Sequence, residues 1–256
     1  MKVRDADRRL FLGGAGGLIG LAWVVLWLWG QSPYGRFLRH EDLALVRLND
    51  GGCLLLFAAG WTVMIAAMML PTSLPLVVAF RTLVQLRRDH AWLLALLLAG
   101  YLGVWSLFGL LVHVGDWGLH RAVARSPWLV GHLWLLEAGP LLLAGLYQFT
   151  PLKYYCLDRC RAPLSFIATH WHGRHRAADA LWLGAHHGLF CLGCCWSLMV
   201  LMFVVGVGNL GWMFALGALM FSEKILAGGR RLSALFGVLL VGAGVLLTLG
   251  NIFAAS

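Results

Sequence analysis

The sequence has little charge for its length. Charged residues occupy 12% of the 256 positions and only 11 residues are acidic, whereas hydrophobic residues make up 61%. Soluble domains contain about 25% charged and about 45–50% apolar residues. A chain of this composition cannot cover its surface with polar groups. The shortage of charge therefore argues against a soluble domain and indicates lipid as the solvent.

Familiar catalytic and nucleotide-binding motifs are also missing. The sequence contains no Walker loop, no Rossmann glycine fingerprint, and no zincin or nucleophile-elbow motif. ATP-driven pumping by this chain alone is therefore not expected, and no catalytic residue is assigned. Five of the six cysteines fall into two tight groups, which differs from the disulfide framework of a small secreted domain.

Long apolar stretches dominate what is present. A membrane-spanning helix needs about 20 apolar residues, and seven stretches reach or approach that length. The pattern predicts an all-α integral membrane protein, a polytopic bundle of about seven transmembrane helices that forms a single domain over residues 1–256. The predicted spans cover roughly residues 10–30, 53–80, 91–115, 128–149, 178–208, 210–226 and 232–253.

The positive charges are distributed unevenly between the gaps that separate these spans. With seven spans, 15 of the 20 Lys and Arg residues fall on the side of the N-terminus. Because positively charged loops stay in the cytoplasm, the bias predicts a multi-pass protein of the bacterial inner membrane with its N-terminus inside. The net charge of +9 is then explained by contact with anionic lipid rather than with nucleic acid.

The first cysteine group comprises Cys156 and Cys160, just after the fourth predicted span. Residues four apart share one face of a helix, so the two thiolates can hold one soft metal ion. A single pair is a weak signal, because structural zinc sites combine two such pairs. Two interfacial thiols without a ligand are the alternative.

The second group lies in the fifth predicted span and includes His187, Cys191, Cys194 and Cys195. Steps of three and four residues place them along one stripe of a helix. Thiolates select Cu(I), and thiolate with imidazole also suits zinc, so copper is favoured over zinc. Spans four and five meet at the cytoplasmic face, so the two groups are expected there together. Cysteines are also ordinary core fillers, which is the alternative.

The second predicted span adds methionines and prolines. Met64 and Met68 share a helix face and can carry Cu(I) onward, whereas Met199 and Met202 of span five are interpreted as apolar core residues. Pro71 bends the helix and frees backbone carbonyls, and such breaks often line sites or paths in membranes. A purely structural kink is equally compatible.

Three charged residues lie inside apolar stretches. Glu137 is expected to face a water cavity or a buried donor, and Glu223 marks the inner end of span six. Lys224 is expected to extend its ammonium to the inner surface. The histidine-rich loop over residues 170–175 is interpreted as an exposed basic loop or a weak metal binder.

The chain resembles the predicted metal-binding integral membrane proteins of domain-of-unknown-function family 2182. Three segments carry the resemblance, and they occur in the same order. They are residues 61–71, residues 147–153 followed by Cys156, Cys160, Arg161 and Pro163, and residues 188–199 with the Cys-x2-Cys-Cys-Trp core. The resemblance implies a polytopic membrane protein that binds metal, without implying a reaction.

The sequence therefore predicts a membrane protein that handles copper by binding, delivery or insertion, for a metalloprotein or metallochaperone partner. A membrane thiol–disulfide oxidoreductase, a small-solute permease and an assembly partner without transported cargo are the alternatives, so whether the chain is an enzyme stays open. The predicted ligands are Cys156, Cys160, His187, Cys191, Cys194 and Cys195.

Overall fold

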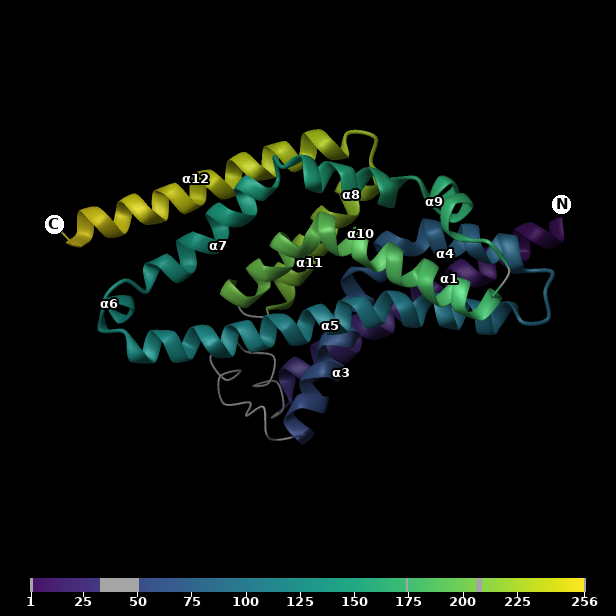
Figure 1. The fold of residues 1–256 in the computed structure, drawn as a ribbon, viewed down its shortest axis with the longest axis horizontal. Coiled ribbons are helices and arrows are strands. Elements are labelled where there is room, and N and C mark those ends of the chain that lie inside the picture. Colours follow the sequence, from purple (N-terminus) through teal and green to yellow (C-terminus); the bar gives the residue numbers. More distant parts are fainter. Residues whose placement is uncertain (1, 33–50, 174, 206–208, 256) are drawn as a thin grey trace.

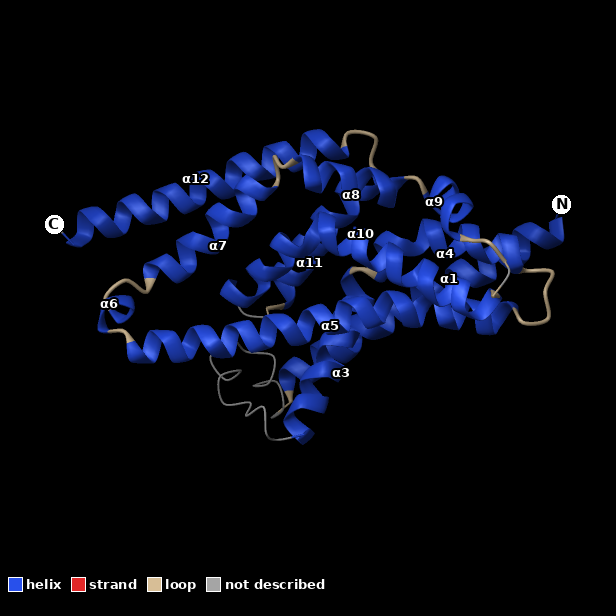
Figure 2. Cartoon of the chain, in the orientation of Figure 1, coloured by secondary structure: helices blue, strands red, loops and turns tan. Residues whose placement is uncertain are grey.

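The computed structural model describes residues 2–32, 51–173, 175–205 and 209–255, and this part of the chain is helical and contains no strand (Figure 2). Figure 1 shows long helices that cross the molecule and shorter ones between them. The helices are α1 (Lys2–Gln31), α3 (Gly51–Met68), α4 (Leu70–Val84), α5 (His90–Arg125), α6 (Pro127–Val130), α7 (Trp134–Tyr147), α8 (Pro151–Arg161), α9 (Pro163–His170), α10 (Arg176–Val205), α11 (Leu210–Ile225) and α12 (Gly229–Ala255).

The all-helical class is confirmed, whereas the number of spans is not. Within the described residues, four helices are long and apolar enough to cross a membrane, namely those over Arg9–Gln31, His90–Arg125, Arg176–Met202 and Gly229–Phe253. The pair α3 and α4 makes a fifth if it is one bent span, while α7 has only 14 residues and α11 only 16. Residues 206–208 of the fifth predicted span lie outside the described residues. Seven spans therefore remain a prediction.

The second predicted span is broken. Helices α3 and α4 meet at an angle of 70° beside Met69. Pro71 lies in the first turn of α4 and has no backbone N–H to donate, so the local hydrogen-bond ladder is interrupted. The carbonyl of Met69 instead accepts hydrogen bonds from Thr72 Oγ1 at 2.8 Å, Ser73 Oγ at 3.3 Å and the Tyr101 hydroxyl at 3.3 Å.

Helix α10 lies at the centre and contacts α5, α7, α8, α9 and α11. Its closest approach to α5 involves Gly184 and Gly100, where an added Cβ would overlap the backbone of the facing helix. Small residues permit this approach, which favours helix association where lipid offers no hydrophobic drive. The approach holds the middle of α10 against α5, so side chains from both helices meet in the core.

Two buried clusters fill the interior. The hydrocarbon core consists of Leu76, Val77, Phe80, Val84, Leu93, Leu97, Phe166, Ile167, Ala180 and Leu183. The sulfur-rich core holds the side chains of Cys156, Cys160, Cys191, Cys194, Cys195, Met64, Met68, Met69, Met199, Met202, Met213 and Met220, with aromatic and aliphatic partners. Every methionine except Met1 thus lies in the second cluster.

Several of the connections between the predicted spans lie at opposite ends of the molecule. In Figure 1, the N-terminus, the α4–α5 connection and α9 lie toward one end, while α6 and the C-terminus lie at the other. No bilayer is part of the structure, so the cytoplasmic placement of the N-terminus stays a prediction.

Candidate metal centre

A buried lysine organises the candidate site. Lys224, near the end of α11, is only 5% exposed. Its Nζ donates hydrogen bonds to Cys191 Sγ at 2.9 Å and to Thr72 Oγ1 at 3.0 Å. The ammonium also interacts electrostatically with Cys160, Cys194 and Cys195. Four thiols from α8 and α10 therefore gather around one positive charge.

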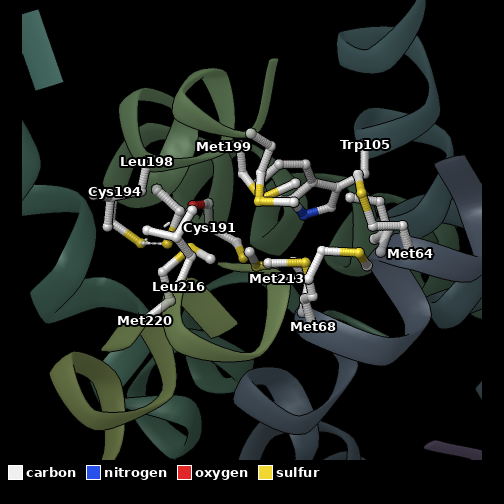
Figure 3. Close-up of a cluster of buried hydrophobic side chains, with 14 of the residues drawn as sticks. Met64, Met68, Trp105, Cys191, Cys194, Leu198, Met199, Met213, Leu216 and Met220 are labelled. Atoms are coloured by element: carbon white, nitrogen blue, oxygen red, sulfur yellow. Dashed lines mark hydrogen bonds between the residues drawn. The ribbon is translucent and has the colours of Figure 1, made fainter. Parts of the chain in front are cut away.

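The thiols also contact one another. Cys194 Sγ lies 3.3 Å from Cys195 Sγ and 3.1 Å from the carbonyl of Cys191, to which it donates. The thiols of Cys160 and Cys194 interact across the α8–α10 contact, and those of Cys191 and Cys195 interact within α10. We call Cys160, Cys191, Cys194 and Cys195 the thiol cluster. Figure 3 shows Cys191 and Cys194 inside the core beside the methionines.

An ion pair fixes α8 against the end of α11. Thr150 caps α8 by accepting a hydrogen bond from the Lys153 N–H, and Pro151 occupies the first turn. Lys153 Nζ then donates to both carboxylate oxygens of Glu223 at 2.9 and 3.1 Å, and both side chains are almost completely buried. Arg161 donates to the Glu223 carbonyl at 3.0 Å. Because Glu223 precedes Lys224, these contacts hold Cys160 and Lys224 in register.

Cys156 lies one helical turn before Cys160, in a different setting. Its Sγ packs against α10 at Gly193, where an added Cβ would lie 2.6 Å from the sulfur. The hydroxyl of Tyr147 donates to the Gly193 carbonyl at the same place. Burial raises the pKa of the Cys156 thiol above its ordinary value. The structure thus places Cys156 against α10, the helix that carries Cys191, Cys194 and Cys195.

His187 lies one turn before Cys191 and is 3% exposed. Its ring stacks on Tyr101 with centroids 5.7 Å apart and meets Phe166 edge-on at 5.5 Å. The Tyr101 hydroxyl in turn lies 3.1 Å from Cys191 Sγ. Among the described residues, His187 Nδ1 has no hydrogen-bond partner. Tyr101 therefore connects the imidazole to the thiol cluster.

The sequence analysis missed the role of the lysines. The expectation that Lys224 reaches the membrane surface is wrong, because its side chain is buried and directed to thiols. Glu223 is explained by the partner Lys153, whose position in an apparently exposed loop gave no signal. Glu137 does line a cavity, of about 510 Å³, together with Asp116 and His120.

The histidine-rich loop is only partly described, since Arg174 lies outside the described residues. His170 stacks on Phe166 with centroids 4.3 Å apart and contacts the ring of His186 at 5.1 Å. The described part of the loop therefore packs partly against the end of the bundle. Its metal binding stays untested.

The donor chemistry of the thiol cluster suits a soft cation. Thiolates and thioethers select Cu(I). A cation beside a cysteine favours its thiolate form over the thiol, and the thiolate is the form that binds the metal. Within the described ranges, no three His, Cys, Asp or Glu side chains already stand as a metal-binding group. The thiols must therefore shift around Lys224 to share an ion.

Comparison with known protein families adds one match. A family model described as PpoB2, copper chaperone, matches residues 58–247. The chain belongs to this family. The matched segment runs from α3 into α12 and includes both cysteine groups and Lys224. No curated protein and no solved structure matches the chain. A copper-related family is thereby confirmed, whereas assignment to family 2182 stays a prediction.

Proposed function

We propose that the chain is a membrane copper chaperone that holds Cu(I) at the thiol cluster and passes it to a metalloprotein. The observation that carries the proposal is the convergence of Cys160, Cys191, Cys194 and Cys195 on buried Lys224. Membership in the copper chaperone family supports copper as the cargo. Zinc, the second choice from the sequence, has no such support.

Charge balance explains why a lysine belongs among copper ligands. A Cu(I) ion bound by two thiolates carries one net negative charge, and isolated charges are costly to bury. The Lys224 ammonium, 2.9 Å from Cys191 Sγ, offsets that charge and makes the loaded site neutral.

Cys156 and His187 belong to the proposal as additional ligands. Each lies one helical turn from a member of the thiol cluster, Cys156 before Cys160 and His187 before Cys191. Both are buried and lie at contacts that border the cluster, one at Gly193 and the other at Tyr101. These positions suit ligands that receive or release the ion at the edge of the site.

The remaining parts of the proposal concern location. Four apolar helices support residence in a membrane, and the excess of Lys and Arg on the N-terminal side supports a cytoplasmic N-terminus. Spans four and five then meet at the inner half of the bilayer, where the protein takes copper from a cytoplasmic carrier. Its partner is a metalloprotein that needs copper for maturation.

The test is the copper content of the full chain, purified in detergent after loading with Cu(I) under a reductant. We expect about one copper ion per chain, and loss of at least about tenfold in retained copper for Cys160→Ser and for Cys194→Ser/Cys195→Ser, because serine is a hard donor. A folded native protein that retains no Cu(I) contradicts the proposal.

Cys156→Ser tests the edge of the site, because it removes a buried thiol of the same helix that packs on Gly193 instead of joining the thiol cluster. We expect it to keep most of the copper at equilibrium and to load more slowly. If Cys156→Ser loses as much copper as Cys160→Ser, the two cysteines of α8 form the principal ligand pair instead of the cluster around Lys224.

The redox alternative retains one supporting observation, the 3.3 Å between the sulfurs of the adjacent Cys194 and Cys195. An oxidoreductase would cycle these thiols together with Cys160. Mass spectrometry of the protein alkylated before and after treatment with an oxidant distinguishes the two functions. Copper retention without reversible thiol oxidation favours the chaperone.

A further inference from the structure

The methionines of this chain are distributed in a way that packing alone does not require. All seven internal methionines lie in the sulfur-rich core, and each is at most 2% exposed. The hydrocarbon core is equally buried and contains neither methionine nor cysteine. A residue used only to fill gaps would occur in both cores. The segregation therefore calls for a role that depends on sulfur.

The methionines connect the thiol cluster to another part of the molecule. Figure 3 shows sulfur atoms in an irregular row, from Cys194 and Cys191 past Met213 to Met68 and Met64, with Met199 beside it. The row draws on α10, α11 and α3, and its members belong to one contiguous cluster. Met68 also packs beside Gly217 of α11, where an added Cβ would lie 3.6 Å from its Cγ. The thioethers and the thiols thus belong to one continuous buried cluster.

Contacts along α5 give the direction of the row. Tyr101 contacts the thiol of Cys191, whereas His113, three turns later, stacks on Phe57 of α3 at 4.5 Å. Twelve residues of helix span about 18 Å, so the core crosses much of a bilayer's apolar thickness between these contacts. Within the described part of the chain, neither ring nitrogen of the buried His113 has a hydrogen-bond partner.

A stripe of buried side chains on α3 follows the same course as the row of sulfur atoms. Phe57, Trp61, Met64 and Met68 recur at steps of three and four residues and are all buried. Trp61 Nε1 donates to the carbonyl of Trp105 at 2.8 Å, which ties the stripe to α5. Met68 lies nearest the bend beside Thr72, and Phe57 lies nearest His113. The row therefore runs from the thiol cluster toward the end of α3 that is remote from Lys224.

We propose that the thioethers of Met220, Met199, Met213, Met68 and Met64 form a path along which Cu(I) leaves the thiol cluster and crosses the helix bundle toward His113. The inference rests on the proposed function and extends it from holding copper to moving it. In each step one Cu–S bond forms as another breaks, and copper stays Cu(I), so no electron is transferred. Neutral thioethers bind Cu(I) more weakly than thiolates, which lets the ion move on.

The test separates holding from movement. The full chain is reconstituted in phospholipid vesicles that enclose a membrane-impermeant, colour-forming Cu(I) chelator, and Cu(I) is supplied outside with a reductant. The rate of colour formation inside reports crossing. Copper retained by the same protein in detergent reports the thiol cluster. Protein-free vesicles give the background rate.

The decisive variant is Met64→Leu/Met68→Leu, because leucine keeps the volume of methionine and removes the sulfur. We expect retained copper within about twofold of the native protein and crossing slower by at least about tenfold. Leu76→Met/Leu97→Met is the matched control, since it makes the reverse exchange at two buried positions of the hydrocarbon core. We expect it to change neither measurement.

Each contrary outcome identifies which idea fails. If the native protein retains copper and shows no crossing above background, or if Met64→Leu/Met68→Leu crosses at the native rate, the methionine path is wrong and the chaperone proposal stands. If the native protein retains no copper, the proposed function itself fails. A decrease in crossing for the hydrocarbon-core control as large as for the methionine variant would assign the effect to packing and overturn the path.

Discussion

The hydrocarbon core and the sulfur-rich core share two helices, α5 and α10, and differ in chemistry. On α10, Ala180 and Leu183 belong to the first core, whereas the residues from Cys191 to Met202 that face inward belong to the second. On α5 the change occurs between Leu97 and Tyr101. Both cores exclude solvent, but only the second combines soft donors with buried charges, Lys224 and the Lys153–Glu223 pair.

The difference shows how the bundle divides its tasks. Buried charges destabilise a fold unless they are paired, so the ion pair and Lys224 are features that packing would not select. The hydrocarbon core packs α4, α5, α9 and α10 together through apolar side chains, at the end of the bundle near α9. The fold therefore keeps its stabilising contacts and its reactive groups in adjacent layers of the same helices.

Among the substitutions that separate the two cores, Glu223→Ala is expected to have the largest effect on stability. The change leaves the ammonium of Lys153, which is completely buried, without its carboxylate partner. Removing one member of a buried pair costs about 3–5 kcal/mol, so we expect a large decrease in the thermal unfolding midpoint in detergent. Asp158→Ala, which removes the exposed partner of Arg230, is the control and should leave the midpoint almost unchanged. Equal shifts would show that burial of the α8–α11 pair is unimportant.

A smaller effect, confined to copper, is expected for Lys224→Met. The variant removes the charge that offsets copper bound by two thiolates, while methionine fills a similar volume. Loss of a hydrogen bond to a charged group costs about 1.5–3 kcal/mol, which corresponds to a decrease of about 10- to 150-fold in Cu(I) affinity. Competition with a Cu(I) chelator measures it. Lys224→Arg keeps the charge and should recover part of the affinity, whereas affinity unchanged in Lys224→Met would remove the lysine from the site.

The smallest expected effect belongs to Gly193→Ala. An added Cβ would lie 2.6 Å from Cys156 Sγ, so this side chain must shift, and overpacking of this kind costs about 1–3 kcal/mol. We expect a modest decrease in the unfolding midpoint and slower copper loading. Gly184→Ala is the comparison from the hydrocarbon side, because its Cβ would overlap the backbone of Leu97 instead of a side chain. A larger destabilisation by Gly193→Ala than by Gly184→Ala would contradict the structure.

Much of the fold follows from composition, because apolar runs of the right length become helices in lipid. The broken second span was also predictable from Pro71, whose missing donor interrupts the ladder. The short length of α7 was not, since apolar runs on both sides of a turn look continuous in sequence, whereas α11 begins and ends within one residue of the predicted segment. The number of spans therefore remains a prediction.

Only part of the candidate site could be predicted from the sequence. Spacing along α10 indicated that Cys191, Cys194 and Cys195 lie together, which short-range helix geometry determines. The convergence of Cys160 on the same thiols depends on how α8 packs, and no local pattern encodes that packing. Lys224 was misplaced because a lysine at a helix end ordinarily reaches solvent, and only tertiary contacts reveal that thiols surround it.

The bend at Met69 lies between the proposed copper site and the proposed methionine path. Thr72, on one side of the bend, accepts a hydrogen bond from Lys224, while Met68, on the other side, belongs to the thioether row. The Met69 carbonyl between them is held by Thr72 and Tyr101, and Tyr101 also contacts the Cys191 thiol. If an ion binds at the thiol cluster as proposed, we expect any rearrangement of the thiols to reach Met68 through this one peptide group.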